Sequence, residues 1–345
     1  YAISGQEGFE SLKQILKIDP QAIVIFMTAY ADTDKAVRAI KAGATDFIPK
    51  PWEKEKLLAT LTSGMRLRHS QREVNILKEQ VELLSGQNSS EGDIIGESPA
   101  MQEVFTTINK LSSTDANILI LGENGTGKDV IARLLYRCSP RYGKPFVTID
   151  LGSIPEQLFE SELFGFEKGA FTDAKKSKAG RMEVATNGTL FLDEIGNLSL
   201  PMQSKLLTAI EKRQINRLGS TQAVPIDVRL ICATNADIRQ LVDEGNFRQD
   251  LLYRINTIEI HIPPLRERGN DIILLAEYFL QRYARKYKKD MRGLTREAKN
   301  KLLKYAWPGN VRELQHTIER AVILGDGSLL KPENFLFHAS PKQRK

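Results

Sequence analysis

Residues 117–128 read Asn-Ile-Leu-Ile-Leu-Gly-Glu-Asn-Gly-Thr-Gly-Lys, an apolar run that enters a glycine-rich turn, and the residues after the turn have helical spacing. The turn fits the pattern Gly-x-x-x-x-Gly-Lys, whose glycines let main-chain N–H groups approach phosphate oxygens while the lysine reaches the terminal phosphates. A helix that begins there adds positive potential. An ordinary glycine-rich turn is the alternative, but the strand before it and the helix after it favour a phosphate-binding loop in an α/β domain.

This phosphate-binding loop supplies a run of consecutive residues as candidate nucleotide contacts. They are Gly122, Glu123, Asn124, Gly125, Thr126, Gly127, Lys128 and Asp129. A Ser or Thr commonly follows the lysine of such a loop and binds Mg²⁺ through its hydroxyl. Asp129 takes that position here, so we expect another group to hold the metal ion.

The chain after the loop alternates between short apolar runs and helical stretches. Together with residues 117–121, the apolar runs are residues 145–151, 189–192, 228–233 and 257–262. Strands separated by helices pair in parallel through right-handed crossovers, which predicts a doubly wound α/β sheet. Two prolines at 263 and 264 end this pattern. Residues 271–286 and 294–324 have helical spacing, so we expect a smaller all-α unit to follow.

Two adjacent carboxylates, Asp193 and Glu194, end the apolar run at residues 189–192. The carboxyl ends of parallel strands border the ligand crevice, so we expect Asp193 to hold Mg²⁺ and Glu194 to polarise a water for attack on the γ-phosphate. An acidic pair at the end of a strand is more often simply solvated. The phosphate-binding loop earlier in the chain makes ATP hydrolysis the favoured interpretation.

Polar and basic residues follow the next strand. Thr234 and Asn235 come where a side chain can sense the γ-phosphate or orient the water, and a helix N-cap is the alternative role. Arg248 and Arg254 come six residues apart, just before the last predicted strand. Guanidinium groups neutralise charge on a transferred phosphoryl group, although a lone arginine more often belongs to a surface ion pair.

The composition excludes several classes of protein. With 345 residues, a net charge of +6 and two cysteines, Cys138 and Cys232, the chain is too long for a mini-protein and too poor in cysteine for a disulfide framework or structural zinc site. Its apolar runs are shorter than the ~18 residues that span a bilayer, and no signal peptide is evident. We therefore expect two or three domains, a cytoplasmic location and no membrane partner.

The first part of the chain has its own α/β alternation. Residues 8–18 and 32–42 have helical spacing, and residues 21–27 and 45–48 are short strand-like runs. Further on, residues 67–84 carry apolar side chains at seven-, three- and four-residue steps. Such spacing fits either a short dimeric coiled coil or a helix packed on its own domain.

Seven segments, in order, resemble the central AAA+ domain of sigma-54-dependent transcriptional activators, the bacterial enhancer-binding proteins. The segments are residues 122–128, 162–165 (Glu-Leu-Phe-Gly), 169–174 (Gly-Ala-Phe-Thr-Asp-Ala), 193–194, 233–235, 247–254 and 307–314 (Trp-Pro-Gly-Asn-Val-Arg-Glu-Leu). The resemblance implies an AAA+ P-loop ATPase with a helical lid that uses ATP and Mg²⁺. Its partners would be sigma-54 and RNA polymerase, whose closed promoter complexes it would remodel as a hexameric ring.

The same resemblance implies roles for individual residues. Arg248 and Arg254 would act in trans on the nucleotide of an adjoining protomer, and Arg312 would act in cis as a second sensor. The segment around Ile94 and Ile95 would contact the adenine. The loop that contacts sigma-54 would comprise Gly169, Ala170, Phe171, Thr172, Asp173 and Ala174.

Residues 1–65 resemble the second half of a response-regulator receiver domain. Thr28 resembles the switch hydroxyl, and Lys50 resembles the lysine that pairs with the phosphorylated aspartate. This resemblance implies a two-component system in which a sensor histidine kinase is a partner. The phosphoacceptor aspartate is expected before Tyr1, so we expect this chain not to be phosphorylated in the manner of the family.

Five segments are therefore expected along the chain. They are a partial flavodoxin-like receiver domain (1–65), a helical linker (66–92), the AAA+ α/β subdomain (93–264), the AAA+ helical lid (265–338) and a linker (339–345) to a missing DNA-binding domain. We expect a chain truncated at both ends. Promoter and enhancer DNA would be a partner only through the missing domain.

Two residues depart from the family pattern. Asp173 stands where glycine is usual in the loop for sigma-54, which places a negative charge beside Phe171 and Thr172. Asp150 stands where an asparagine commonly holds the catalytic glutamate aside. A carboxylate there is expected to repel Glu194 and to change the basal ATPase rate.

Two other functions stay open on the sequence. If Asp173 abolishes the contact with sigma-54, the chain is a nucleotide-gated oligomeric regulator that does not engage sigma-54. A P-loop small-molecule kinase is disfavoured, because the sequence suggests no pocket for an acceptor substrate and such a kinase would have no role for Arg248 and Arg254 acting in trans.

Overall fold

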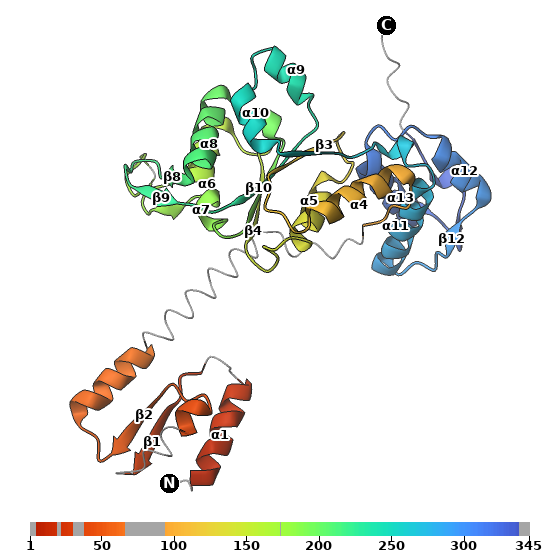
Figure 1. Cartoon of the computed structure of the whole chain (residues 1–345). Coiled ribbons are helices and arrows are strands. Elements are labelled where there is room, and N and C mark those ends of the chain that lie inside the picture. Colours follow the sequence, from red (N-terminus) through yellow and green to blue (C-terminus); the bar gives the residue numbers. More distant parts are fainter. Residues whose placement is uncertain (1–4, 19–21, 30–37, 66–93, 173, 338–345) are drawn as a thin grey trace. The chain divides into compact units, whose positions relative to one another are not determined.

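The computed structural model describes residues 5–18, 22–29, 38–65, 94–172 and 174–337 of the chain (Figure 1). These residues belong to two compact units, Tyr1–Glu82 and Leu83–Lys345, and each is described by itself. The predicted linker at 66–92 and the tail at 339–345 lie outside the described residues. None of the described helices combines the length and apolar character that a bilayer span requires. Both cysteines are free thiols, in agreement with the prediction.

The first unit contains two parallel strands. Its described elements are α1 (Gly5–Ile18), β1 (Ile25–Ala29), β2 (Asp46–Lys50) and a helix at residues 54–65. β1 and β2 pair with Thr28 opposite Pro49, and α1 contributes Leu12 to a small core with Ala39 and Ala44. Both predicted strands exist, although each begins and ends later than the sequence pattern indicated. Most of the predicted helix at 32–42 lies outside the described residues.

Five parallel strands form the central sheet of the second unit, in the order β11-β3-β10-β7-β4. They are β3 (Ile118–Leu121), β4 (Phe146–Asp150), β7 (Thr189–Asp193), β10 (Arg229–Thr234) and β11 (Ile258–His261). Each strand end lies within one residue of its prediction, so the doubly wound parallel sheet is confirmed. Strands buried on both faces are continuous apolar runs, which is why the sequence located them well.

Helices cover both faces of this sheet and make three layers (Figure 1). One face carries α4 (Pro99–Leu111) and α5 (Lys128–Arg137), and the other carries α6 (Glu156–Phe164), α7 (Arg181–Val184), α8 (Leu200–Lys212), α9 (Ile238–Asp243) and α10 (Gln249–Ile255). Because side chains alternate along a strand, Ile118 and Ile120 join the core under α4 and α5 while Leu119 joins the opposite core. A 3-10 turn, Ile195–Asn197, follows β7.

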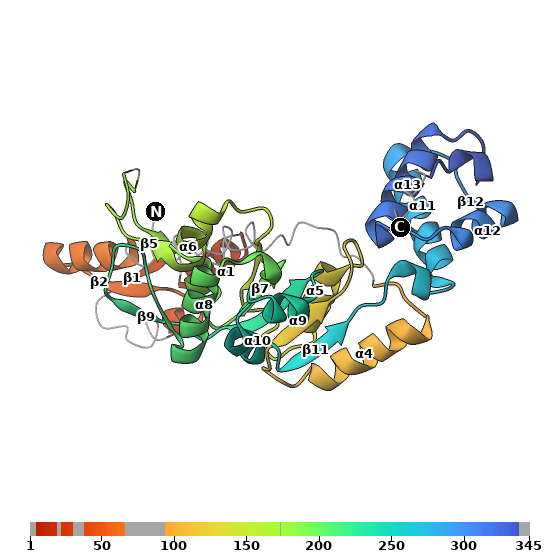
Figure 2. The ribbon, with the colours of Figure 1, turned by 90° about the horizontal axis from the view of Figure 1, so that it is seen from above.

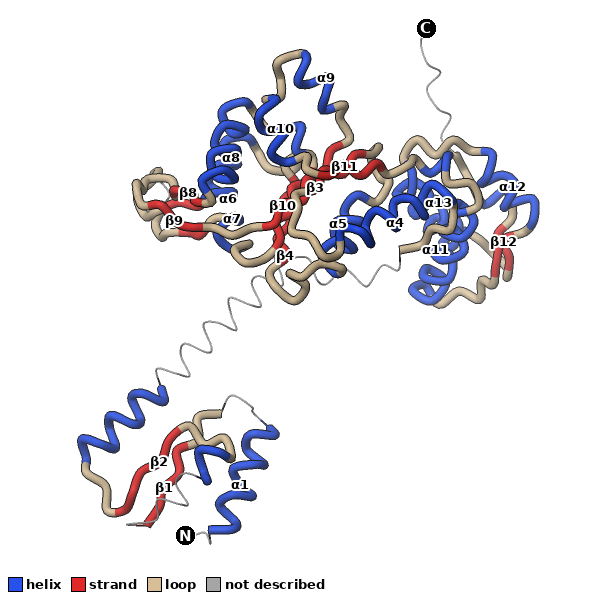
Figure 3. The backbone as a smooth tube through the Cα atoms, viewed as in Figure 1, coloured by secondary structure: helices blue, strands red, loops and turns tan. Residues whose placement is uncertain are grey.

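Two short hairpins were not predicted. They are β5 (Gly165–Phe166) with β6 (Lys178–Ala179), and β8 (Gln214–Asn216) with β9 (Ala223–Pro225). The loop between β5 and β6 projects from the body of the unit (Figure 2), and β8 and β9 extend beyond α8 (Figure 3). The Glu167 N–H donates to the Leu218 main-chain oxygen at 2.9 Å, so the two hairpins support one another. Strands of two or three residues carry too little periodicity to be recognised.

The lid that follows the sheet is helical, with one correction. Its elements are Leu265–Glu267 (3-10), α11 (Asp271–Tyr287), β12 (Gly293–Leu294), α12 (Arg296–Lys304), α13 (Asn310–Leu324), β13 (Leu329–Leu330) and Pro332–Asn334 (3-10). The sequence indicated helix throughout 294–324, but Trp307 and Asn310 have φ of 50° and 52° and separate α12 from α13. β12 and β13 also pair in parallel, so the lid is not purely α-helical.

Candidate nucleotide-binding and hydrolysis site

The phosphate-binding loop joins β3 to α5 in the predicted strand–turn–helix arrangement. Gly125 and Gly127 have φ of 77° and 98°, and a Cβ at Gly125 would lie 2.4 Å from the main-chain oxygen of Gly309. Glycine is therefore required at Gly125 for both its conformation and its close approach to the lid. Lys128 is buried at the start of α5 and donates to the main-chain oxygen of Gly122 at 3.1 Å. Asp129 follows it and is exposed.

The acidic pair lies beside this loop. The Lys128 Nζ is 3.6 Å from Glu194 Oε1, and the Asn235 N–H donates to Glu194 Oε2 at 3.3 Å. The Glu194 N–H donates to Asp193 Oδ1 at 3.0 Å, and Glu194 itself has a left-handed φ of 56°. The ends of β3, β7 and β10 thus bring Lys128, Asp193, Glu194 and Asn235 together.

Asp193 has an unusual ionisation. Its burial, and then the neighbouring Glu194 carboxylate, raise the pKa of Asp193 from 3.8 to about 6, and Asp150 adds to this rise. Asp150 lies opposite Asp193 in the β4–β7 pairing and accepts from the Gly152 N–H at 2.9 Å. The sequence led us to expect that Asp150 would repel Glu194. In the structure Asp150 raises the pKa of Asp193, and Glu194 is held by Lys128 and the Asn235 N–H. The expected repulsion between Asp150 and Glu194 stays a prediction.

The charge on Asp193 should destabilise the protein when nucleotide and metal are absent. Because the folded state holds the Asp193 proton more tightly than the unfolded chain, ionisation lowers stability progressively as pH rises from about 4 to about 6. We expect Asp193→Asn to raise the free energy of unfolding at pH 7.5 by about 1 to 3 kcal/mol. Urea unfolding at several pH values measures this, and the gain should disappear near pH 4.

The fully exposed Asp290 provides the control for that measurement. Among the described residues it pairs with the exposed Arg292 alone, so Asp290→Asn should change stability little at either pH. An Asp193→Asn protein that is less stable than wild type at pH 7.5 contradicts the prediction.

Thr234 ends β10 and is buried. Its hydroxyl accepts from the Ala236 N–H at 3.1 Å, whereas Asp237 caps α9 by accepting from the N–H groups of Arg239 and Gln240. The alternative role of an N-cap is therefore wrong for Thr234. The side chain instead fixes the turn that carries Asn235.

Residues of the lid also contact the phosphate-binding loop directly. The Gly125 main-chain oxygen accepts from the N–H groups of Val311 and Arg312, at 2.9 and 3.3 Å. The buried Asn310 amide donates to Glu123 Oε2 and to the Asn124 main-chain oxygen, at 3.1 and 3.0 Å. Through these contacts the predicted sensor Arg312 lies next to the loop, where its side chain lines a groove of about 390 Å³ that Asn124 also borders.

Arg268 is a residue that the sequence analysis missed. It is buried, and its guanidinium donates to the main-chain oxygens of Thr126 and Pro263, at 2.8 and 2.9 Å. Burial lowers the pKa of Arg268 to about 10, so the side chain stays charged at neutral pH and adds positive potential beneath the loop. No local pattern reveals this contact, because its partner lies 142 residues away in the sequence.

An apolar cavity of about 180 Å³ adjoins the loop between α5 and the lid. Ile94 and Ile95, the predicted adenine contacts, both line it, as do Val130 and Tyr278. An apolar cavity next to a phosphate-binding loop suits a nucleobase.

The two candidate arginines lie away from this loop. Arg248 precedes α10, and its guanidinium pairs with Asp250 at 2.6 Å and contacts the Ser204 hydroxyl at 3.1 Å. Arg254 is near the end of α10, and its main-chain oxygen accepts from the Asn117 side chain at 3.0 Å. The structure therefore does not bring either arginine to the nucleotide site of its own chain.

The loop at residues 169–174 lies between β5 and β6. The Gly169 N–H donates to the Ala174 main-chain oxygen and the Ala174 N–H to that of Phe171, both at 2.9 Å. The Phe171 ring is 44% exposed and lies 4.9 Å from the Phe166 ring. Ala170 packs near Gly219, Thr172 is exposed, and Asp173 lies outside the described residues.

In the first unit, Thr28 and Lys50 lie toward the carboxyl ends of the adjacent strands β1 and β2. The Lys50 side chain is exposed, and that of Thr28 lies outside the described side chains. The two residues can therefore border one site at this edge.

The side chains near the loop suit Mg²⁺. The described residues contain no group of three or more His, Cys, Asp or Glu side chains arranged as a metal site. Magnesium bound with a nucleotide commonly takes one or two carboxylates, the remaining ligands coming from phosphates and water. The carboxylate of Asp193 lies beside the loop and is an oxygen donor of this kind.

Sequence profiles of three domains match this chain. They are the sigma-54 interaction domain at residues 94–261, the AAA+ ATPase lid domain at 266–345 and the response regulator receiver domain at 1–62.

Full-length relatives and solved structures agree with the domain matches. The chain is 45% identical over 324 residues to the transcriptional regulatory protein ZraR of Klebsiella oxytoca, covering 94% of this chain and 71% of ZraR. It is 44% identical over 324 residues to the DNA-binding transcriptional regulator NtrC of Escherichia coli K12, covering 94% of this chain and 67% of NtrC. Crystal structures of NtrX from Brucella abortus with ADP and with ATP are similar at a TM-score of 0.66 each. Their sequence identities are 31% and 30%, covering 95% and 98% of this chain and 73% and 74% of NtrX.

One chain thus contains a receiver domain, a phosphate-binding loop with an acidic pair, and a sigma-54 interaction domain. It belongs to the sigma-54-dependent response regulators, AAA+ ATPases that activate transcription by sigma-54 RNA polymerase within two-component systems.

Proposed function

We propose that this ATPase acts as a hexameric ring in which two adjoining protomers share each nucleotide. The position of Arg254 carries the proposal. Asn117, which holds the main chain of Arg254, precedes β3, whereas the phosphate-binding loop follows β3. The strand has four residues and spans about 13 Å, so Arg254 lies at the edge of the sheet opposite its own loop. From this position the guanidinium of Arg254 can reach only a nucleotide that is bound by another protomer.

Within one protomer, the proposed site works as follows. Lys128 and the N–H groups of the phosphate-binding loop hold the phosphates, and Ile94 and Ile95 contact the adenine. Asp193 contributes to binding Mg²⁺, which when bound neutralises charge on the phosphates. Glu194 orients and polarises the attacking water, and Arg312 senses the nucleotide from the lid. Contacts with Lys128 and with the Asn235 N–H restrain Glu194 until nucleotide binds, because the phosphates compete for Lys128.

We further propose that residues 169–174 contact sigma-54. The exposed Phe171 provides an aromatic anchor on a glycine-flanked loop, as is usual at interaction hot spots. The hydrogen bond from the Glu167 N–H to the Leu218 main-chain oxygen connects this loop to the β8–β9 hairpin. A movement of that hairpin during hydrolysis would therefore also move the loop.

Phe171→Ala should uncouple hydrolysis from sigma-54. Loss of an interface aromatic commonly costs about 2 kcal/mol or more, so we expect the complex with sigma-54, formed with ADP and a metal fluoride, to weaken at least about 30-fold. The ATPase rate should change less than about twofold. Native gel shift and phosphate release measure the two quantities.

Tyr142→Ala is the matched control, since Tyr142 is an exposed aromatic outside the contact loop. It should leave the complex intact. A wild-type chain that hydrolyses ATP but never binds sigma-54 would instead support the nucleotide-gated regulator proposed from Asp173.

Ring assembly has its own test. The ATPase rate per protomer should rise steeply with protein concentration, because a lone protomer lacks the arginines of its neighbour. A rate per protomer that does not depend on concentration contradicts the shared site.

The remaining proposals concern regulation. Thr28 and Lys50 act as the receiver switch once a histidine kinase phosphorylates the full-length protein. Enhancer and promoter DNA is bound through a DNA-binding domain, and the receiver or residues 66–92 contribute dimer contacts. A transcription activator of this family works in the cytoplasm.

A further inference from the structure

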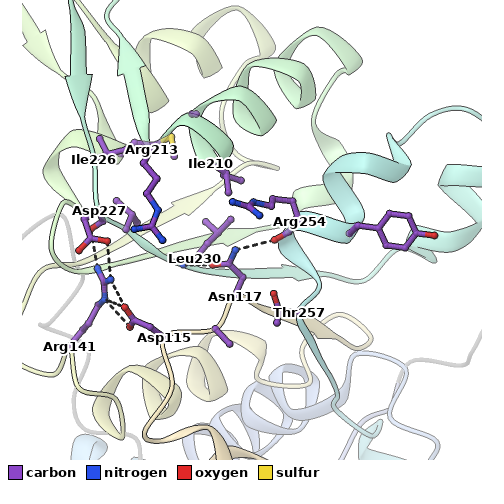
Figure 4. Close-up of a pocket in the computed structure, with 15 residues that line it drawn as sticks. Asp115, Asn117, Arg141, Ile210, Arg213, Ile226, Asp227, Leu230, Arg254 and Thr257 are labelled. Atoms are coloured by element: carbon purple, nitrogen blue, oxygen red, sulfur yellow. Dashed lines mark hydrogen bonds and ion pairs between the residues drawn. The ribbon is translucent and has the colours of Figure 1, made fainter.

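A cavity of about 490 Å³ opens at the edge of the sheet where β3, β10 and β11 begin (Figure 4). Asn117, Leu230 and Thr257 from these strand starts line it, together with Arg213 after α8 and Arg254 near the end of α10. The phosphate-binding loop lies at the opposite edge. The cavity is therefore separate from the nucleotide site of the same protomer.

Some of the charges around this cavity neutralise one another. Arg141 donates to the carboxylates of Asp115 and Asp227 and to the main-chain oxygens of Gly188 and Asp227. The buried Arg229 and the exposed Arg213 also act on Asp115, and all three arginines lower the pKa of that carboxyl. Arg141 alone contacts both aspartates directly.

Arg213 and Arg254 make no direct contact of this kind. Within the part of the chain that the structure describes, neither guanidinium has a hydrogen bond or an ion pair, and both side chains are exposed. Figure 4 shows that the Arg254 side chain extends toward Arg213, whose guanidinium lies on the side of the cavity where Asp227 and Arg141 lie. Two guanidinium groups that line one cavity without a direct hydrogen bond or ion pair suit a ligand with several negative charges, such as a polyphosphate.

The backbone at Arg213 is a second, independent observation. Arg213 is the C-cap of α8 and has a left-handed φ of 51°, a conformation that favours glycine. Its main-chain oxygen accepts from the Ile226 N–H at 2.9 Å, a bond that glycine would keep. An arginine at a strained position, with no hydrogen bond or ion pair among the described residues, points to a role outside its own protomer.

We propose that Arg213 is a third cation, beside Arg248 and Arg254, that holds the phosphates of the nucleotide bound by an adjoining protomer. The cavity is the docking position of that triphosphate. This inference rests on the proposed ring, because Arg254 lines the same cavity. It adds a residue that no sequence motif of the shared site contains.

Arg213→Gly tests the proposal without disturbing the fold, because glycine suits the left-handed backbone. We expect ATP turnover at saturating ATP to fall about 10- to 100-fold. The KM for ATP should change less than about threefold, since the phosphate-binding loop is intact, and the melting temperature should stay equal or rise. Arg213→Lys should restore part of the rate, because it keeps the charge but not the bidentate fork.

Lys212→Ala is the matched control. Lys212 is an exposed cation one position earlier that does not line this cavity. Its removal should leave turnover unchanged. Equal losses in Lys212→Ala and Arg213→Gly would show an effect of net charge and would overturn the proposal.

Mixing variants decides whether Arg213 acts on another protomer. Arg213→Gly protomers retain Glu194, and Glu194→Gln protomers retain Arg213 and Arg254, so a mixed ring contains complete composite sites. The mixture should hydrolyse ATP at least about fivefold faster than Arg213→Gly alone at the same total concentration of protein. Arg254→Ala mixed with Glu194→Gln serves as the reference pair.

The outcomes separate this inference from the ring itself. If Glu194→Gln protomers restore turnover to Arg254→Ala but not to Arg213→Gly, the role of Arg213 is wrong and the proposed ring is supported. If they restore turnover to neither variant, both the role of Arg213 and the shared site are wrong. Undiminished turnover by Arg213→Gly overturns the inference. A second outcome would also overturn it: monomeric Lys128→Ala protomers bind pyrophosphate, and adding Arg213→Gly abolishes that binding. The cavity would then be a site for a free anion rather than for the nucleotide of a neighbour.

Discussion

Replacing Glu194 by glutamine is expected to lower ATP turnover by about 10²- to 10⁴-fold while ATP still binds, the range that general acid–base groups contribute. Glutamine keeps the shape of the side chain, and its oxygen can still accept from the Asn235 N–H. It cannot polarise water as a carboxylate does, and it no longer pairs with Lys128. Steady-state phosphate release gives the rate, and titration with a fluorescent ATP analogue gives the affinity.

The affinity for ATP should rise slightly in Glu194→Gln, because Lys128 loses the carboxylate that competes with the phosphates. Glu244→Gln is a suitable control, since Glu244 is exposed at the end of α9 and its carboxylate accepts from the neighbouring side chains of Gln240 and Asn246. A Glu194→Gln protein that hydrolyses ATP at the wild-type rate would remove Glu194 from the role of water-activating residue.

The sequence predicted the central sheet because its strands are buried on both faces. Thr189–Asp193, for example, is apolar at three consecutive positions and then ends in an acid, so both the strand and its carboxyl end are visible in the pattern. The break between α12 and α13 was overlooked, although Pro308 and Gly309, which lie between the two helices, commonly end a helix. Tertiary contacts impose it: the Trp307 indole donates to the Leu302 main-chain oxygen, and the buried Asn310 reaches the phosphate-binding loop.

The candidate site divides in the same way. Residues at or just after the end of a strand, such as Asp193, Glu194 and Thr234, could be predicted because parallel strands end at one edge of the sheet. Contacts made by a distant segment could not. Arg268 beneath the loop depends on how the lid packs, and Arg213 depends on a backbone conformation that no periodicity reports.

Replacing Arg254 by alanine is expected to lower ATP turnover by about 10³- to 10⁵-fold, the contribution of arginines that act in trans in other NTPases. The Asn117 side chain fixes the end of α10 to the start of the sheet, so Arg254 is held in place before a neighbour arrives. Among described residues its guanidinium has no partner to give up. Its full charge is thus available to the developing transition state. Binding of ATP to the loop of the same protomer should be unchanged.

Arg248→Ala should have the smaller effect of the two. Arg248 forms an exposed bidentate pair with Asp250, and this pair must open before the guanidinium can reach a neighbouring nucleotide. Asp250→Ala should therefore leave turnover equal or higher, since it frees Arg248. Suppose that the Arg254→Ala protein turns over ATP as fast as wild type and that its rate per protomer does not depend on concentration. The nucleotide site is then complete within one protomer, and the proposal of a shared site is wrong.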